Sequence, residues 1–448
     1  MLDIQKINSF INNIVWGPYM LILLLGVGIF FTVKLKFFPL IHFKTWWKYT
    51  VLSFLKSNKS SSNERISPFQ AMATALAGSI GTGNIVGVAN AIALGGAGAV
   101  FWMWIAAFFG MSTVFAENVL GIKYRTKRNG KYVGGPMYYI EKGLKCKWLA
   151  VIFSIFCTLA AFGMGNMTQA NSVSGALQNG FGISPKITGI ILSILVGIII
   201  FGGIGRISKL TEKLVPVMAV IYTIAVFIVI TVNFREIPNA FGEIFIQAFD
   251  FKAVSGGFMG YGMSKAVKYG ISRGVFSNEA GLGSSPIVHS AADTDDPYQQ
   301  GMWGIFQVFI DTIVLCTLMA LCILTTNSDK TNLDGIELST YSFETVLGHA
   351  GNIFMSLSII LFAFATLVSW SYYGEKSLEY LTNGKYISVY RIIYSIIVYI
   401  GCTTNISLVW EISDTLNGFM AIPNLVALIL LSHEIKYSEL SHNLLRKR

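Results

Sequence analysis

The stretch Ala77-Gly78-Ser79-Ile80-Gly81-Thr82-Gly83-Asn84 decides the fold class that the sequence predicts. It lies within residues 68–94, a segment that carries no charged residue and is long enough to cross a bilayer. Glycine costs about 1 kcal/mol in a helix interior relative to alanine, so this stretch predicts a helix that stops and restarts. In lipid, the freed backbone groups must be satisfied by protein, water or a bound solute. The break is therefore either a solute-binding site or a patch of small residues packed against another helix.

The composition of the whole chain supports a membrane location. Of its 448 residues, 53% are hydrophobic and 12% are charged, about half the charged fraction of an ordinary soluble protein. The net charge of +10 comes from basic residues concentrated in certain loops, so it does not predict a nucleic-acid partner. The five cysteines lack the spacing of metal ligands, and we expect no cofactor other than a coupling ion. We therefore predict an all-α polytopic membrane protein in contact with the lipid bilayer.

Apolar runs divide the chain into eleven predicted transmembrane helices, the first of which is a retained span rather than a signal peptide. Their approximate bounds are 15–35, 68–94, 97–122, 148–178, 185–205, 212–233, 256–292, 299–325, 349–380, 387–404 and 408–432.

The charges of the connecting loops predict the orientation. Loops 34–67 and 123–147 are rich in lysine and arginine, whereas residues 326–348 are mostly acidic among their charges. The positive-inside rule then places the N-terminus outside and the C-terminus in the cytoplasm, in the cell membrane. Helical spacing of apolar residues in 237–252 predicts an amphipathic helix at the outer surface, and 336–347 resembles it.

A second polar, glycine-rich break occurs at residues 275–286, five crossings after the first. Paired broken helices in corresponding positions indicate inverted repeats with a binding site near the membrane midplane. The predicted repeats are 68–233 and 256–432, each with five crossings. Residues 1–67 form an extra helix and basic loop, 234–255 the outer amphipathic helix, and 433–448 a basic tail. The alternative places 275–286 in a cytoplasmic loop.

The two breaks offer complementary chemistry. The N–H groups that begin the second half of a broken helix favour an anion, and the C=O groups that end the first half favour a cation. An amino-acid carboxylate would suit the N–H groups near Thr82, Gly83 and Asn84. Its ammonium group would suit carbonyls near Phe276, and a metal cation would suit carbonyls at Ala77 and Ile80.

Polar and aromatic residues in other crossings are candidates for the same cavity. Gln169 either binds a zwitterion or makes an interhelical hydrogen bond. Thr366 and Ser369 interrupt the apolar ninth crossing and could complete a sodium site, although Thr366 could instead bond its own helix backbone. Trp370 and Phe276 either wall a small pocket or serve as ordinary packing.

Four acidic residues lie inside predicted crossings, where a charge is costly and usually functional. They could pair with a cation such as Arg273 or Lys265, or carry coupling protons, and we favour structural pairing. We expect His289 to make a satisfied polar contact. The four acids are Glu117, Glu279, Asp311 and Asp414.

Several motifs together resemble the alanine/glycine:cation symporter family, also called the sodium:alanine symporters. The most specific is residues 95–110, GGAGAVFWMWIAAFFG, which is similar to the family signature over its full length. The resemblance extends over residues 16–432. Its other motifs are IGTGN (80–84), GGPMYY (134–139), FSNEAGLGS (276–284), WSYYGEK (370–376) and DTLNG (414–418).

This resemblance implies an importer of alanine and glycine driven by sodium symport, and we separately expect the protein to function as a monomer. It also implies the five-plus-five inverted-repeat fold of the LeuT type, in the APC superfamily, with one extra N-terminal helix and two discontinuous helices. The rival interpretations are a proton-coupled symporter of the same fold, a channel and a membrane enzyme, although no catalytic constellation favours the enzyme. The implied substrate-binding residues are Thr82, Gly83, Asn84, Gln169, Phe276, Thr366 and Trp370, and the implied sodium ligands are Ala77, Ile80, Thr366 and Ser369.

Overall fold

The structure is a computed structural model that describes residues 2–53, 66–128, 130–249, 259–404 and 406–440. The ends of the predicted segments 237–252 and 256–292 that fall in 250–258, residues 54–65 of the basic loop, and residues 441–448 of the basic tail lie outside this part. The first half contains α1 (Leu2–Val15), α2 (Pro18–Lys34), α3 (Phe38–Ile41), α4 (Phe43–Trp47), η1 (Lys48–Leu52), α6 (Pro68–Ser79), η2 (Thr82–Asn84), α7 (Val86–Gly95), α8 (Gly98–Lys123), α9 (Pro136–Gly143), α10 (Lys147–Phe162), η3 (Gly163–Met167), α11 (Thr168–Phe181), α12 (Pro185–Ile200) and α13 (Gly203–Val232).

The first half also contains one antiparallel pair of short strands, β1 (Thr126–Arg128) and β2 (Lys131–Val133), which follows α8. The second half is also mostly helical. The helices of the second half are η4 (Phe234–Glu236), α14 (Ile237–Ala248), α15 (Met259–Asn278), α16 (Ser285–His289), α17 (Pro297–Val308), η6 (Phe309–Cys316), α18 (Thr317–Thr325), η7 (Ser328–Lys330), α19 (Gly335–Leu347), α20 (His349–Thr382), α21 (Ile387–Thr403), α22 (Ile406–Leu430) and η8 (Ser432–Glu434).

Local sequence explains where the first broken helix begins. Pro68 occupies the first turn of α6, where a missing N–H costs nothing. Ser67 and Gln70 form a reciprocal capping box, in which each side chain accepts a hydrogen bond from the other residue's backbone N–H, at 3.1 and 2.9 Å. Asp296 caps α17 in a similar way by accepting from the N–H groups of Tyr298 and Gln299. These caps fix the residue at which each helix begins.

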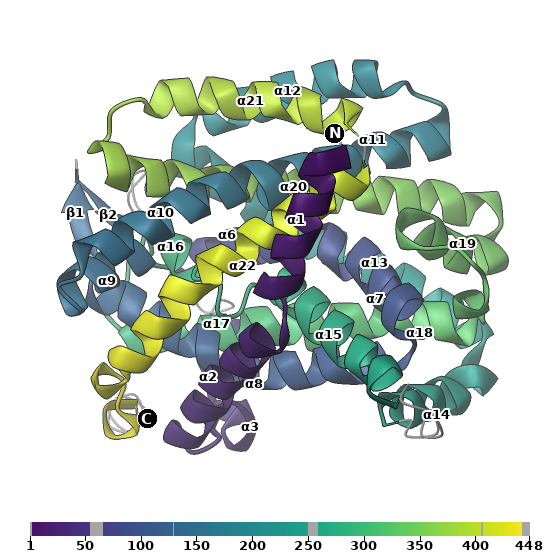
Figure 1. The fold of residues 1–448 in the computed structure, drawn as a ribbon, viewed down its shortest axis with the longest axis horizontal. Coiled ribbons are helices and arrows are strands. Elements are labelled where there is room, and N and C mark those ends of the chain that lie inside the picture. Colours follow the sequence, from purple (N-terminus) through teal and green to yellow (C-terminus); the bar gives the residue numbers. More distant parts are fainter. Residues whose placement is uncertain (1, 54–65, 129, 250–258, 405, 441–448) are drawn as a thin grey trace.

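The helices form a bundle with two distinct ends (Figure 1). One end carries β1, β2, α9 and the last described residues, and we call it the tail end. The opposite end carries α14 and α19, and we call it the α14 end. Between them, α8 packs against α15 and α17, while α20 packs against α6, α10 and α11.

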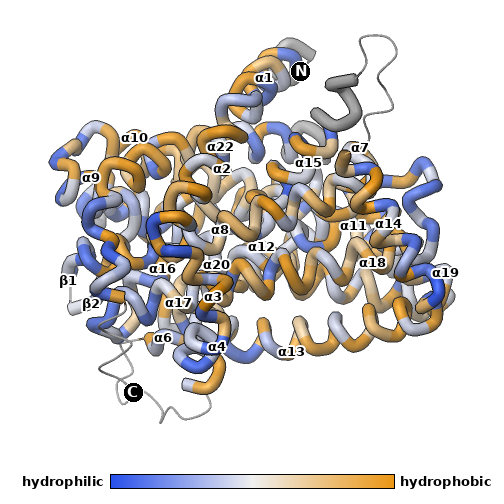
Figure 2. The backbone as a smooth tube through the Cα atoms, turned by 90° about the horizontal axis from the view of Figure 1, so that it is seen from below, coloured by the Kyte–Doolittle hydropathy of each residue, from blue (hydrophilic) through white to orange (hydrophobic). Residues whose placement is uncertain are grey.

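The outer helices present apolar faces. Figure 2 shows the hydrophobic residues that run along α13, and α12 and α21 carry similar residues. Ile194 and Ile198 of α12 are 58% exposed, and Ile224 of α13 is 56% exposed. Such a continuous apolar surface suits the lipid bilayer rather than water. The chain is therefore a multi-pass membrane protein.

The described helices confirm part of the predicted set of eleven crossings. Among the described residues, seven helices are long and apolar enough to cross a membrane, and the bent pair α6–α7 makes eight. α12 and α21 are shorter apolar helices. The predicted boundary between crossings five and six is wrong, because α13 begins at Gly203 and carries Arg206, Lys209 and Lys213 as helical residues. The predicted gap at residues 206–211 is helical, because a helix can continue beyond the apolar region.

The predicted helices next to the α14 end are confirmed as helices. They are α14, which lies within predicted segment 237–252, and α19, which covers predicted segment 336–347 and begins one residue earlier. The ninth crossing is continuous as α20, so its polar residues interrupt the apolar run without interrupting the helix. The polar stretch 163–169 does disturb the fourth crossing, because a π-helical turn, η3, joins α10 to α11.

Candidate functional site

The first break is confirmed as a bend inside the bundle. α6 ends at Ser79, and the helix that resumes at Thr82 is inclined to it by 56°. The Gly81 N–H donates to Asn84 Oδ1 at 3.2 Å, and the Thr82 N–H donates to Gln169 Oε1 at 3.3 Å. The buried Thr82 hydroxyl has no partner among the described residues. The break thus combines satisfied backbone groups with a free hydroxyl that could bind a solute.

Oxygen atoms gather where α20 passes the end of α6. The Thr366 hydroxyl donates to the carbonyl of Ala77 at 2.9 Å, and lies 3.5 Å from that of Ile80. It also contacts the carbonyl of Phe362, one turn earlier in its own helix, at 3.2 Å. Ser369 contacts a different carbonyl, that of Thr74, at 2.5 Å. Three of the four predicted sodium ligands therefore lie together, and Ser369 instead contacts a carbonyl one turn earlier in α6.

The second break lies within the bundle. Residues 275–290 are all buried, which argues against the alternative of a surface loop. Three residues adopt the left-handed backbone conformation: Glu279 (φ 60°), Gly281 (φ 88°) and Gly283 (φ 80°). Two polar side chains satisfy the freed backbone: Glu117 accepts from the Gly283 N–H at 3.1 Å, and Asn424 donates to the Gly281 carbonyl at 2.9 Å.

The two breaks touch each other. A Cβ atom at Gly83 would lie only 3.1 Å from the Ser277 Cα and 3.4 Å from the Phe276 ring. Asp311, in η6, joins them: its carboxylate accepts from Asn84 Nδ2 and from the Ser277 hydroxyl, each at 2.8 Å. The sequence marked Asp311 only as an acid in an apolar helix. Its role as the link between the breaks needed the three-dimensional packing.

Two aromatic residues predicted to wall the pocket are buried beside the breaks. The Phe276 ring stacks on Trp410 with centroids 5.0 Å apart. Trp370 donates its indole N–H to Glu279 Oε1 at 2.7 Å. Trp410 was missed by sequence reasoning. Its position one helical turn before the intramembrane Asp414 was the available signal.

A partly buried ion pair covers the aromatic pair on the side of the α14 end. Arg273 Nη1 and Nη2 meet Asp414 Oδ1 and Oδ2 at 3.1 and 2.7 Å, in a bidentate arrangement. The guanidinium carbon lies 5.6 Å from the Phe276 ring centroid and 5.4 Å from that of Trp410. The predicted pairing of an intramembrane acid with Arg273 is confirmed for Asp414. In the described part of the chain, the hydrogen-bond partners of Glu117, Glu279 and Asp311 are uncharged groups.

On the side of the tail end, backbone contacts hold the two broken helices together. Residue Ile66, just before α6, forms a parallel bridge with Ala292, and the Asp293 N–H donates to the Ile66 carbonyl at 2.8 Å. Arg125 donates to the carbonyls of Ala292 and Thr294 at 2.7 and 2.6 Å. One guanidinium therefore clamps the segment that follows α16.

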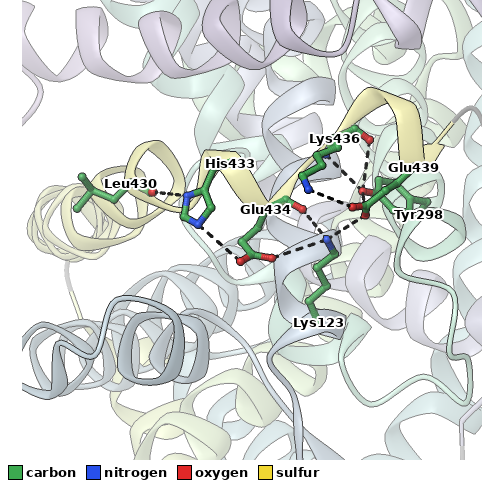
Figure 3. Close-up of polar contacts among 7 residues, drawn as sticks. All are labelled: Lys123, Tyr298, Leu430, His433, Glu434, Lys436 and Glu439. Atoms are coloured by element: carbon green, nitrogen blue, oxygen red, sulfur yellow. Dashed lines mark hydrogen bonds and ion pairs between the residues drawn. The ribbon is translucent and has the colours of Figure 1, made fainter.

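The last described residues reinforce this end (Figure 3). Glu439 accepts hydrogen bonds from Lys123 Nζ at 3.2 Å and from the Tyr298 hydroxyl at 2.8 Å. The Tyr298 hydrogen bond and the Lys123 charge lower the pKa of the Glu439 carboxyl. The contacts join the end of α8 and the start of α17 to the chain after α22.

The predicted substrate residues are all buried, so this conformation closes the region between the breaks on both sides. Thr82, Gln169 and Thr366 lie around the first break, and Phe276 and Trp370 lie at the second. Gly83 and Asn84 contact the second helix through Ser277 and Asp311. The structure thus brings the predicted set together from α10–α11, α15, α20 and the first broken helix.

Two broken helices that meet inside a helical bundle define a secondary transporter of the LeuT type. A crystal structure of MhsT in complex with L-phenylalanine has the same fold, with a TM-score of 0.62 over 82% of this chain and 89% of that one, at 14% identity. The sequence profile of the sodium:alanine symporter family matches residues 1–443. The chain belongs to that family.

Individual relatives are similar in sequence to this chain over almost its whole length. The chain is 46% identical to the sodium/alanine symporter AgcS of Methanococcus maripaludis, over 100% of this chain and 99% of that protein. It is 40% identical to an uncharacterised transporter of Haemophilus influenzae, over 96% of this chain and 94% of that protein.

Gly81 offers a test of the packing at the first break. A Cβ at this position would lie 2.4 Å from Thr366 Oγ1 and 3.2 Å from Gln169 Oε1, whereas a Cβ at Gly87 of the same broken helix would meet only an atom at 3.9 Å. We predict that Gly81→Ala lowers alanine uptake by about tenfold or more, because a small displacement in a preorganised site has a large effect. Uptake into proteoliposomes measures this, with Gly87→Ala as the matched control. If Gly81→Ala and Gly87→Ala gave equal alanine uptake, tight packing around Gly81 would not be needed for transport.

Proposed function

We propose that this protein imports alanine and glycine by symport with sodium through alternating access. The observation that carries the proposal is the junction of the first break with α20. There, the carbonyls of Ala77 and Ile80 face the hydroxyl of Thr366, and hydroxyl and carbonyl oxygens suit a hard cation such as sodium. Membership of the sodium:alanine symporter family supports the same coupling ion and substrate.

The substrate would lie between the two breaks. Its carboxylate would meet the start of the resumed helix near Thr82, Gly83 and Asn84, where the helix dipole favours an anion. The Gln169 carbonyl oxygen already accepts from this backbone, and the Phe276 and Trp370 rings limit the space for a side chain. Glycine and alanine fit such a pocket because they present little or no side chain.

Alternating access requires that each end of the pathway can close. The Arg273–Asp414 pair closes the α14 end over Phe276 and Trp410, and Arg125 with the Ile66–Ala292 bridge closes the tail end. The positive-inside rule favours the tail end as cytoplasmic, so the ion pair would face outside. The repeats 68–233 and 256–432 would then move against each other, each led by its broken helix, with one polypeptide sufficient for transport.

Proton coupling is the alternative that a specific observation favours. Glu117, Glu279 and Asp311 are buried, and the hydrogen-bond partners that the described residues give them are neutral. Any of these carboxyl groups could carry a proton across the membrane. The coupling ion therefore has to be tested directly.

The central experiment is uptake of labelled alanine into proteoliposomes under an imposed ion gradient. We expect an inward sodium gradient to drive concentrative uptake, because each charge moved gains about 2.3 kcal/mol per 100 mV of membrane potential. Replacing sodium with choline should abolish it, and unlabelled glycine should compete. Full uptake driven by a proton gradient in sodium-free buffer would exclude sodium coupling and support the proton-coupled alternative.

Thr366 is predicted to bind sodium, substrate or both, and paired variants separate these roles. Thr366→Val removes the hydroxyl at nearly constant volume, whereas Thr366→Ser retains it. If the hydroxyl binds sodium, Thr366→Val should raise the sodium concentration for half-maximal uptake by about tenfold, the equivalent of one hydrogen bond to a charged group. Thr366→Ser should stay near the wild type. A change in the alanine KM alone, at saturating sodium, would assign the residue to the substrate instead.

The ion pair at the α14 end has its own test. Asp414→Asn leaves the partly buried Arg273 charge uncompensated, and we expect maximal alanine uptake to fall by about tenfold, or about 1.4 kcal/mol of coupling. The double variant Arg273→Gln/Asp414→Asn should recover part of that loss. Lys330→Gln serves as the control, because Lys330 and Glu243 form an exposed pair with atoms 3.9 Å apart. Unchanged uptake by Asp414→Asn would show that the pair does not gate transport.

A further inference from the structure

Glu279 is an unusual residue at the end of a helix. Its N–H continues the helical pattern by donating to the Val275 carbonyl at 2.8 Å, but its own backbone is left-handed, with φ of 60°. Glycine normally occupies this position, because a Cβ atom disfavours the left-handed conformation. Glycine does occupy positions 281 and 283 of the same break. A glutamate in this unfavourable backbone conformation indicates that its side chain makes an interaction that glycine could not make.

The carboxylate of Glu279 bridges two parts of the bundle. Its Oε1 atom accepts the indole N–H of Trp370 in α20 at 2.7 Å, and its Oε2 atom accepts the Ser284 hydroxyl at 2.5 Å. All three side chains are buried. Both donors are neutral, so the contacts are directional hydrogen bonds rather than an ion pair.

Trp370 has little freedom once this bond is made. Its Cβ packs on the bare backbone of Gly165, where an added Cβ would lie 2.3 Å away, and its ring meets Tyr373 edge-on at 5.2 Å. The indole N–H is the only polar group of the side chain, and it has one donor. Packing therefore fixes the base of Trp370, and Glu279 fixes the direction in which the ring points.

Trp370 also lies on the side of α20 that meets the first break. It follows Thr366 by four residues, and therefore lies on the same face of α20 as the hydroxyl that contacts the first break. Glu279 belongs to the second break. The hydrogen bond thus ties the orientation of a pocket wall to the conformation of a broken helix.

We propose that Glu279 is a positioning residue that holds the Trp370 indole and thereby sets the largest side chain that the transporter accepts. The inference rests on the proposed function, because it assumes that Trp370 walls the substrate pocket. Glu279 acts through its hydrogen-bond acceptor and not through its charge or a transported proton. Loss of the bond frees the ring to rotate and enlarges the pocket for α-amino acids one or two carbons longer than alanine.

The test compares variants that separate the hydrogen bond from the charge. Glu279→Gln keeps an acceptor for Trp370 and removes the charge, while Glu279→Leu removes both at similar volume. Trp370→Phe keeps the carboxylate and removes the donor. Trp303→Phe is the matched control, because the buried Trp303 indole N–H has no partner among the described residues.

The readout is the competition of 2-aminobutyrate and valine against labelled alanine in sodium-energised proteoliposomes. We expect Glu279→Leu and Trp370→Phe to improve competition by 2-aminobutyrate relative to glycine by about tenfold, the value of one methylene group in a tight pocket. Their double variant should be no less selective than either single variant, because both changes remove the same bond. Glu279→Gln and Trp303→Phe should keep the wild-type selectivity.

Two outcomes would overturn the proposal. If Glu279→Gln changes selectivity or abolishes uptake as Glu279→Leu does, the charge or a proton is essential instead of the hydrogen bond. If Trp370→Phe lowers uptake without changing selectivity, the bond is only structural. If Glu279→Leu does not fold, the comparison of Trp370→Phe with Glu279→Gln still tests the proposal. Absence of sodium-driven alanine uptake in the wild type would instead refute the proposed function.

Discussion

The need to satisfy backbone groups inside a membrane governs the arrangement of this molecule. Each break frees N–H and C=O groups that lipid cannot satisfy, and the protein supplies partners for them. At the first break, Asn84, Gln169 and Thr366 meet the exposed groups, and at the second, Glu117 and Asn424 do so. These partners come from helices far apart in the sequence, so the breaks organise the packing of the bundle around themselves.

The same requirement explains how charge is distributed in the interior. A bidentate arginine balances Asp414, which lies toward one end of the pathway. Asp311 and Glu279 lie at the breaks, where amide, hydroxyl and indole donors surround them. Hydrogen bonds from neutral donors stabilise a carboxylate without an opposite charge beside it. Asp414 is therefore held by an opposite charge, whereas Asp311 and Glu279 are held by directional hydrogen bonds.

Much of this organisation was accessible from the sequence. Clustered glycines predicted the bend after Ser79, family motifs predicted the fold, and an intramembrane arginine predicted the pairing with Asp414. Contacts that depend on how one helix is rotated against another were not accessible. Helical spacing cannot indicate that Ser369 meets Thr74 rather than Ala77, or that Trp410 stacks on Phe276. The π-helical turn at η3 also escaped prediction as such, because its sequence indicates an interruption but not its geometry.

The close approach of Gly83 to Ser277 has a consequence for how such transporters diversify. Where main-chain atoms form the polar floor of a pocket, the recognising groups are the same whatever side chains mutation introduces, because nearly every residue carries one N–H and one C=O. Such a floor suits the ammonium and carboxylate groups that all α-amino acids share. In the proposed pocket, walls built from side chains such as Phe276 and Trp370 can then vary separately. Substitutions in the walls can change which amino-acid side chain is accepted, while the backbone groups that bind the ammonium and carboxylate stay the same.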